Sequence, residues 1–267
     1  MKNDDERAGP PNGLMLYHLE FSTCSQKVRL ALAEKGLAYG SHLIDRTKGE
    51  LLSDWYLALN PNGVVPTLQH HGEPVTDSSV ICEYLDEVFP EPPLSPRSAL
   101  GRAQMRAWMR YFEEVPTTAI RIPSFNQFKG LHRATMGEAA FLAYTEKLPL
   151  RKHFYRQMGA NGFDSEKTEE SLERLKNCLR RVSNALADGR RFLLGEAYTI
   201  ADIVLVPTVV RLEDLKLTDL WSDLPNVARW YDSVRARPSF AIAFAGGARI
   251  DPAAMVPAPP AAALRPG

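Results

Sequence analysis

The sequence predicts a small α/β domain followed by an all-helical domain. Before residue 90, short apolar runs typical of strands alternate with stretches of helical spacing. Residues 90–96 then contain four prolines in seven positions, which excludes a helix or a central strand and marks a linker. After this linker, helical patterns dominate. At 267 residues the chain is long enough for two units of this kind.

The first domain is expected over residues 14–90, after a flexible lead-in over residues 1–13. Its first helix should begin at Thr23, because Thr23 and Gln26 have the spacing of a capping box. The expected elements, in order, are a strand over 14–19, a helix over 23–36, a strand near 41–44, a short helix near 51–58, strands at 67–69 and 74–75, and a helix over 80–89. This order suits a thioredoxin-like sheet.

The second domain is expected over residues 100–245, after a linker at 91–99. The helical patterns cover 97–115, 136–158 with a break at Pro149, 165–186, and three segments that begin at Thr199, Thr218 and Pro225. The segment from Thr199 is apolar on every side, and Asp202 stands in capping-box position, so this helix should be the core of its domain. Residues 246–267 are rich in Ala and Pro and are expected to form a flexible tail.

Composition and charge exclude several classes of function. The formal net charge is zero, which gives no electrostatic case for binding nucleic acid or an acidic membrane surface. No apolar run approaches the roughly 18–20 residues that span a bilayer, and residues 1–13 lack a hydrophobic signal core. The cysteines, Cys24, Cys82 and Cys178, are odd in number and show no metal-ligand spacing. We therefore expect a cytoplasmic protein without a metal site.

The stretch 60–79 carries the strongest functional signal. A proline that heads a strand cannot donate to the ladder, and cis peptide bonds are concentrated at such X-Pro turns. If the Val65–Pro66 bond is cis, the backbone N–H and C=O of Val65 point outward and can pair with an extended peptide ligand. Further on, Asp77, Ser78 and Ser79 open a helix, and a helix start suits a carboxylate. The alternative interpretation is an ordinary hairpin followed by a capped helix.

Residues 64–68 followed by residues 77–81 resemble the glutathione-binding half of the glutathione transferase family. Residues 198–211 resemble the capping-box core helix of the same family, and residues 225–238 resemble its late helix. The resemblance implies an N-terminal thioredoxin-like domain, a C-terminal all-helical glutathione transferase domain, and glutathione as co-substrate. It also implies the ligand contacts in glutathione: Val65 and Pro66 at the cysteinyl unit, Asp77 and Ser78 at the γ-glutamyl end. Arg46 and Lys48 are candidates for the glycyl carboxylate, or else form a solvated charge run.

The segment Phe21-Ser-Thr-Cys-Ser25 determines which chemistry is open to the protein. A redox member of the fold would carry cysteines at Ser22 and Ser25, and a hydroxyl cannot form a mixed disulfide. A hydroxyl beside a helix start can instead hold a thiolate, and together these groups lower a thiol pKa by roughly 1–3 units. By resemblance Ser22 aligns with the catalytic serine of serine-type transferases, and Ser25 with a serine of the bacterial β-etherase branch. Two alternatives stay open: both serines only cap the helix, or Cys24 is the nucleophile.

The second substrate should lie against the helical domain and is expected to be a hydrophobic aromatic molecule. The candidate lining residues are Trp108, Tyr111, Phe125, Phe128, Phe141 and Tyr144. The long region 118–163 and residues 76–90 resemble bacterial glutathione-dependent β-etherases, which implies cleavage of lignin-type β-aryl ethers. The alternatives are detoxifying conjugation, isomerisation, a ligandin-like binder, or a scaffold subunit. Family members usually dimerise, so a homo- or heterodimer is expected.

Overall fold

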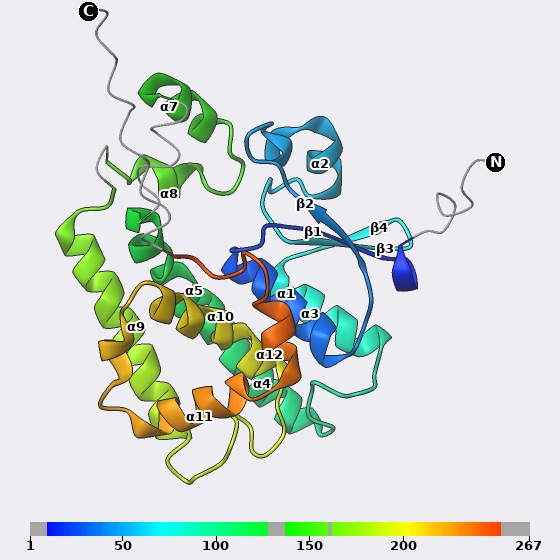
Figure 1. Ribbon diagram of the computed structural model, residues 1–267, viewed down its shortest axis with the longest axis vertical. Helices are drawn as coiled ribbons and strands as arrows, with labels where there is room; N and C mark the ends of the chain where they lie inside the picture. The colour runs from blue at the N-terminus through cyan, green and yellow to red at the C-terminus, as the bar shows by residue number, and fades with distance from the viewer. Residues whose placement is uncertain (1–9, 128–136, 160–161, 252–267) are drawn as a thin grey trace, which may run out of the picture.

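The computed structural model describes residues 10–127, 137–159 and 162–251. A small sheet and its helices form one domain, and a larger set of helices packs against it (Figure 1). Helix α1 (Thr23–Glu34) lies between the two, since it packs on α3 (Ser78–Val88) of its own domain and on α10 (Ile200–Asp214) and α12 (Pro238–Ala243) of the other. The predicted fold class is therefore confirmed.

The sheet has the strand order expected of a thioredoxin-like domain. Its four strands are β1 (Leu14–His18), β2 (Gly40–Leu43), β3 (Thr67–His70) and β4 (Glu73–Thr76), in the spatial order β2-β1-β3-β4. Strand β1 pairs parallel with β2 and antiparallel with β3, and β3 pairs antiparallel with β4. The short helix α2 (Asp54–Leu59) and the 3-10 turn η3 (Glu50–Leu52) stand between β2 and β3. Each predicted strand is present.

The regular elements in the described part of the second domain are all helical. Its remaining elements are α4 (Ala99–Glu114), α5 (Pro116–Ala119), a helical stretch over 121–127, α7 (Glu138–Glu146), α8 (Lys152–Arg156), α9 (Ser165–Ala185), η4 (Thr218–Trp221) and α11 (Pro225–Arg235). The segment from Thr218 is one 3-10 turn and not a full helix, because Pro225 soon opens the next helix. Helix α10 is buried along nearly its whole length, as predicted, with Pro207 inside it.

The start of α10 is tied to two other parts of its domain through Asp202. The predicted capping box is present, and the Asp202 carboxylate accepts from the Thr199 N–H at 3.0 Å. The same carboxylate accepts from the Leu193 N–H at 3.0 Å and from Trp230 Nε1 at 2.9 Å. Burial raises the pKa of Asp202, and these hydrogen bonds oppose that rise. A buried carboxylate with this many donors fixes the loop, α10 and α11 to one another.

Ion pairs from α1 join the two domains. The ammonium of Lys27 is buried and lies 2.7 Å from Glu113 Oε1 and 3.1 Å from Thr117 Oγ1. At the other end of the helix, Glu34 forms a two-pronged pair with Arg237, each contact at 2.6 Å. Because α1 is held at both ends, the position of its first turn relative to the helical domain is well determined.

The predictions of flexible tails are wrong for the residues of each tail next to the folded domains, because those residues are ordered. Residues 246–251 pack on the protein: the Gln26 side chain donates to the Ala248 carbonyl at 2.6 Å, Ile250 is buried, and Arg249 pairs with Glu213 at 2.7 Å and with Asp214. The Ala- and Pro-rich composition of residues 246–267 predicts a flexible segment and gives no indication of these contacts.

At the other end of the chain, residues 11–13 form a 3-10 turn whose Gly13 carbonyl accepts from the His71 N–H at 2.9 Å. Residues 1–9 and 252–267 lie outside the described part of the chain. Over the described ranges, no helix combines the length and apolarity needed to cross a bilayer.

Candidate functional site

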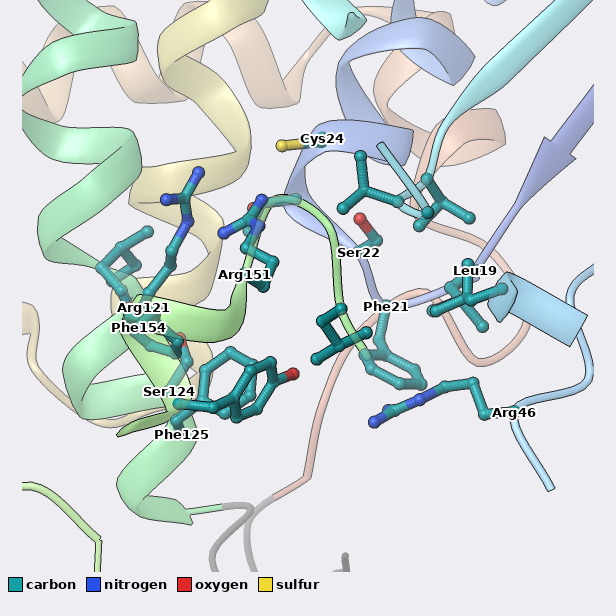
Figure 2. Close-up of a pocket in the computed structure, with 18 of the residues that line it drawn as sticks. Leu19, Phe21, Ser22, Cys24, Arg46, Arg121, Ser124, Phe125, Arg151 and Phe154 are labelled. Carbon is teal, nitrogen blue, oxygen red and sulfur yellow. The ribbon is translucent and has the colours of Figure 1, made fainter. Parts of the chain in front are cut away.

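A cavity of about 170 Å³ lies between the two domains, where the first turn of α1 faces the helical domain (Figure 2). The first domain contributes Leu19, Phe21, Ser22, Thr23, Cys24, Arg46, Leu51, Gly63, Val64 and Val65. The second domain contributes Ile120, Arg121, Ser124, Phe125, Tyr144, Leu148, Arg151, Phe154, Tyr155 and Arg211. The two walls differ in chemistry, so they are described in turn.

Ser22 is the N-cap of α1. Its backbone is extended (φ −69°, ψ 121°), and its Oγ accepts from the Ser25 N–H at 3.3 Å. The predicted cap at Thr23 is wrong by one residue, because Thr23 is already helical and the Gln26 side chain turns away to the Ala248 carbonyl. The cap role uses a lone pair of Ser22 and leaves its O–H free to donate.

The first turn of α1 also offers backbone donors to the cavity. Within the described residues, the amides of Thr23 and Cys24 have no hydrogen-bond acceptor, as is usual for the first positions of a helix. Ser22, Thr23 and Cys24 all line the cavity. A hydroxyl, two amides and the positive end of the helix dipole therefore converge where an anion can bind.

Ser25, the second candidate for contact with the thiolate, does not face the cavity. Its side chain is fully buried, and its Oγ accepts from the Leu19 N–H at 3.4 Å. Ser25 therefore shapes the loop that leads into the helix, and its hydroxyl does not line the cavity. Cys24 does line the cavity and remains the alternative nucleophile. Burial raises the pKa of the Cys82 thiol, which lies in the core as expected.

The loop before β3 has the predicted form. The Val65–Pro66 peptide bond is cis. The Val64 carbonyl accepts from Tyr56 Oη at 2.7 Å and from Asn60 Nδ2 at 2.9 Å, which holds the loop from behind. The backbone amide and carbonyl of Val65 have no partner among the described residues, and Val65 lines the cavity. The main-chain clamp is therefore open, and Pro66 shapes it without lining the cavity itself.

Asp77 and Ser78 stand at the start of α3 and do not line this cavity. Asp77 caps the helix: its Oδ1 accepts from the Ser79 N–H at 3.0 Å and from Ser79 Oγ at 2.7 Å. Ser78 is buried. A ligand that reached both this helix start and the cavity would have to extend past Val65, so the γ-glutamyl role of the two residues stays a prediction.

Two of the predicted aromatic lining residues face the cavity. Phe125 and Tyr144 line it, and Phe154 and Tyr155 join them, with ring centroids 5.1 Å and 5.5 Å from that of Phe125. These four rings form an aromatic wall on the helical side.

The other aromatic predictions do not hold at the cavity. Trp108 and Tyr111 point toward α9, where the guanidinium of Arg181 lies 5.1 Å and 4.0 Å from their rings. Neither residue lines this cavity; both pack beside the core that Met105, Met109 and Phe112 occupy. Phe141 is buried in a separate cluster with Met158 and Phe163. Phe128 lies outside the described residues.

Sequence reasoning missed the charge of the cavity. Arg121, Arg151 and Arg211 line it from the helical domain and Arg46 from the first domain, whereas no acidic residue is among its described lining. Arg211 is almost fully buried and donates to the Phe21 carbonyl and, at 3.3 Å, to Ser124 Oγ. Its signal was present in the sequence, because Arg211 is the only charged residue of the apolar stretch 203–212.

Arg121, Arg211 and the two cavity tyrosines keep their neutral-pH charge states. Burial, and then the charge of Arg151, lower the pKa of Arg121 to about 10. Burial also lowers the pKa of Arg211 to about 10. Burial raises the pKa of Tyr144 and Tyr155, so both phenols stay protonated. The cavity is therefore positively charged at pH 7.

Comparison with known proteins identifies the family. The model of the glutathione S-transferase N-terminal domain matches residues 21–88, and that of the C-terminal domain matches residues 165–233. The crystal structure of the beta-etherase LigF from Sphingobium sp. strain SYK-6 is similar, with a TM-score of 0.77 and 30% identity over 87% of this chain and 98% of that chain. The chain belongs to the glutathione S-transferase family. Glutathione is therefore its co-substrate.

Two further relatives show how wide the chemistry of similar transferases is. The glutathione S-transferase TCHQD of Arabidopsis thaliana is 27% identical over 85% of this chain and 88% of that protein. A tetrachloro-p-hydroquinone reductive dehalogenase of Sphingobium chlorophenolicum is 28% identical over 84% of this chain and 93% of that protein. Family membership thus leaves the second substrate of this transferase to be argued from its cavity.

Proposed function

We propose that this transferase cleaves β-aryl ethers, with the thiolate of glutathione as the nucleophile. The observation that carries the proposal is the cavity itself. It joins a helix start rich in hydrogen-bond donors to an aromatic wall made by Phe125, Tyr144, Phe154 and Tyr155. The similarity to the beta-etherase LigF supports this choice among the reactions of the family.

The first turn of α1 stabilises the thiolate. Ser22 donates its O–H to the sulfur, and the amides of Thr23 and Cys24, which have no acceptor among the described residues, are available to the same anion. A hydrogen bond to a charged group contributes about 1.5–3 kcal/mol, and a helix dipole about 0.3–1 kcal/mol. At about 1.36 kcal/mol per pKa unit, these contributions bring a thiol of pKa about 8.5 close to neutrality.

The main-chain clamp positions the sulfur. The free N–H and C=O of Val65 pair with the cysteinyl unit of glutathione, in a loop fixed by Pro66 and held from behind by Tyr56. Asp77 and Ser78 bind the γ-glutamyl end, and Arg46 binds the glycyl carboxylate. Two contacts on the backbone of one residue orient the thiolate toward the helical wall.

The reaction is a displacement at the carbon next to a ketone. The thiolate forms a C–S bond to that carbon, the C–O bond to the aryl group breaks, and the electron pair leaves with the phenolate, which then takes a proton from water. The aromatic wall packs against the rings of the ether. Since the described lining holds the phenol hydroxyls of Tyr144 and Tyr155 but no carboxylate, the negative charge of the leaving phenolate is stabilised.

The test measures both products of the proposed reaction. With glutathione and an α-aryloxy acetophenone, we expect phenol and the glutathione thioether to form in equal amounts. Chlorodinitrobenzene conjugation serves as the general transferase assay. Conjugation without phenol release would assign general conjugation instead. Binding of glutathione without either reaction would assign a ligandin-like role, and failure to bind glutathione would remove the proposal.

A further inference from the structure

We propose that the second substrate carries a carboxylate beside its aromatic ring, and that Arg121 and Arg151 bind that carboxylate. The inference rests on the proposed function only in taking the helical wall as the site of the second substrate. It concerns which aromatic molecules the site selects, and it makes these two arginines determinants of specificity.

The guanidinium groups of Arg121 and Arg151 carry charges that no carboxylate pairs with among the described residues. The acid that acts electrostatically on Arg121 is Glu113, but that carboxylate lies 2.7 Å from the buried ammonium of Lys27. The charge of Arg121 and Arg151 is therefore left for a ligand.

The remaining arginines of the cavity already have tasks. Arg211 holds the Phe21 carbonyl and the Ser124 hydroxyl, and so braces the loop that carries Ser22. Arg46 comes from the first domain and is our candidate for the glycyl carboxylate of glutathione. The glutathione thiolate is met by the start of α1. The γ-glutamyl carboxylate is assigned to the start of α3 at Ser78, so no anionic group of glutathione is left for Arg121 and Arg151.

The sequence places each arginine next to aromatic side chains. Arg121 precedes Phe125 by four residues in a helical stretch, and Arg151 precedes Phe154 and Tyr155 by three and four residues at the start of α8 (Lys152–Arg156). Residues three and four apart lie on one face of a helix. Both segments thus present a guanidinium group and a ring together, and Phe125 and Phe154 meet edge to face at 5.1 Å.

The arrangement fits an aryl carboxylate. Figure 2 shows Arg121 and Arg151 reaching into the same part of the cavity, above the rings and near Cys24. The repulsion between them contributes to the lowered pKa of Arg121, which agrees with their proximity. A guanidinium group binds a carboxylate through two parallel hydrogen bonds, and a ligand anion between two such groups also relieves their repulsion.

The test compares an acid with its neutral amide. We use 4-acetylbenzoate and 4-acetylbenzamide, which have no leaving group, and measure their binding by calorimetry in the presence of glutathione. We expect the wild-type protein to bind the acid about 10- to 100-fold more tightly. In Arg121→Gln and in Arg151→Gln this preference should fall below about threefold, while the affinities for the amide and for glutathione stay unchanged.

The control is Arg156→Gln, which removes a positive charge from the same segment. Arg156 is exposed, pairs with Glu146 at 2.6 Å and does not line the cavity, so its loss should leave the preference intact. Thermal melting checks that each variant is folded, and either arginine variant alone is sufficient for the test.

Three results would overturn the proposal. Equal binding of acid and amide by the wild type would show that no carboxylate is recognised. A loss of glutathione affinity in both arginine variants would assign the pair to the glycyl carboxylate. An equal loss in Arg156→Gln would reduce the effect to overall charge. Since the ligands do not react, a preserved acid preference without phenol release from the ether would sink the proposed reaction and leave this inference standing.

Discussion

Two helix starts in this molecule use the same capping chemistry but have different roles. Helix α1 begins after Ser22 and helix α10 after Thr199, and in both a polar side chain near the cap accepts from a backbone N–H. At α1 the hydroxyl and two amides face a cavity. At α10 the cap is buried, and Asp202 accepts from a loop amide and an indole as well.

The difference lies in the surroundings and not in the cap itself. Around Asp202, packing completes the hydrogen bonds, so the helix start contributes to stability. Around Ser22, a cavity between the two domains leaves donors that have no partner among the described residues, so the helix start can contribute binding energy for an anion. A helix cap is thus a binding site only where the fold keeps its hydrogen-bond donors accessible to a ligand.

The largest expected effect is on the free energy of unfolding, through the buried start of α10. Asp202→Ala leaves the amides of Thr199 and Leu193 and the indole of Trp230 without an acceptor. Each unpaired buried donor costs about 1–3 kcal/mol, so with three of them the free energy of unfolding should fall by at least about 3 kcal/mol. Denaturant titration measures the change.

The matched control is Asp164→Ala at the start of α9. Asp164 is an exposed cap that accepts from the Lys167 N–H at 2.8 Å, and its loss should lower the free energy of unfolding by about 0.5–2 kcal/mol. Equal losses in the two variants would show that burial does not separate the two kinds of helix start, and the comparison would fail at its first step.

A smaller effect is expected from the pH dependence of the unfolding free energy, through His18 on the strand that leads into α1. His18 is buried at the end of β1, and Arg29 donates to its Nδ1 at 3.2 Å, so its Nε2 carries the proton and donates to Ser41 Oγ at 2.8 Å. Burial and then the charge of Arg29 lower the pKa of His18 to about 4.

Between the folded pKa of about 4 and the unfolded value of 6.5, the unfolded chain binds more protons at His18. Stability therefore rises with pH over this window and is lost as the pH falls through it, by up to about 3 kcal/mol from this residue. We expect His18→Gln to flatten the slope of unfolding free energy against pH between 6.5 and 4. An unchanged slope would show that His18 is protonated alike in both states.

Most of the fold was accessible from the sequence because its signals are local. The proline cluster at 90–96, the cis-proline loop and the Thr199–Asp202 spacing each determine structure within a few residues. The packing of residues 246–251 was not predicted, since the Gln26 contact to Ala248 joins positions 222 residues apart. The cap predicted at Thr23 is wrong because of the same contact. The spacing of Thr23 and Gln26 suits a capping box, but the Gln26 side chain donates to a carbonyl far away in the sequence.

Of the candidate site, only the part that the first domain contributes could be predicted from the sequence. Val65 and Ser22 lie in short motifs, whereas the second wall is assembled from a helix near 121, a turn near 151 and α10. No local pattern relates Arg121 to Arg151, and their chemistry appears only when three segments meet. Trp108 and Tyr111 were misplaced because helical spacing gives two faces and does not say which of them meets the core.

The smallest effect in free energy, and the most decisive for function, is expected at the open helix start. Ser22→Ala removes the hydroxyl donor, and the pKa of bound glutathione should rise by about 1–2 units, so turnover near pH 6.5 should fall about 10- to 100-fold. The loss of the cap should lower the free energy of unfolding by only about 0.5–2 kcal/mol. The thiolate absorbance of bound glutathione, followed against pH, measures the shift.

Ser98 supplies the matched comparison, because it is also a serine cap, with Oγ 3.0 Å from the Gly101 N–H, but it lies away from the cavity. Ser98→Ala should lower stability as much as Ser22→Ala and leave the pKa of bound glutathione unchanged. Ser25→Ala should also leave that pKa unchanged, because its buried hydroxyl serves the Leu19 amide. If Ser22→Ala leaves the pKa where it was, the amides of Thr23 and Cys24 hold the thiolate alone, and Ser22 is a cap of the same kind as Ser98.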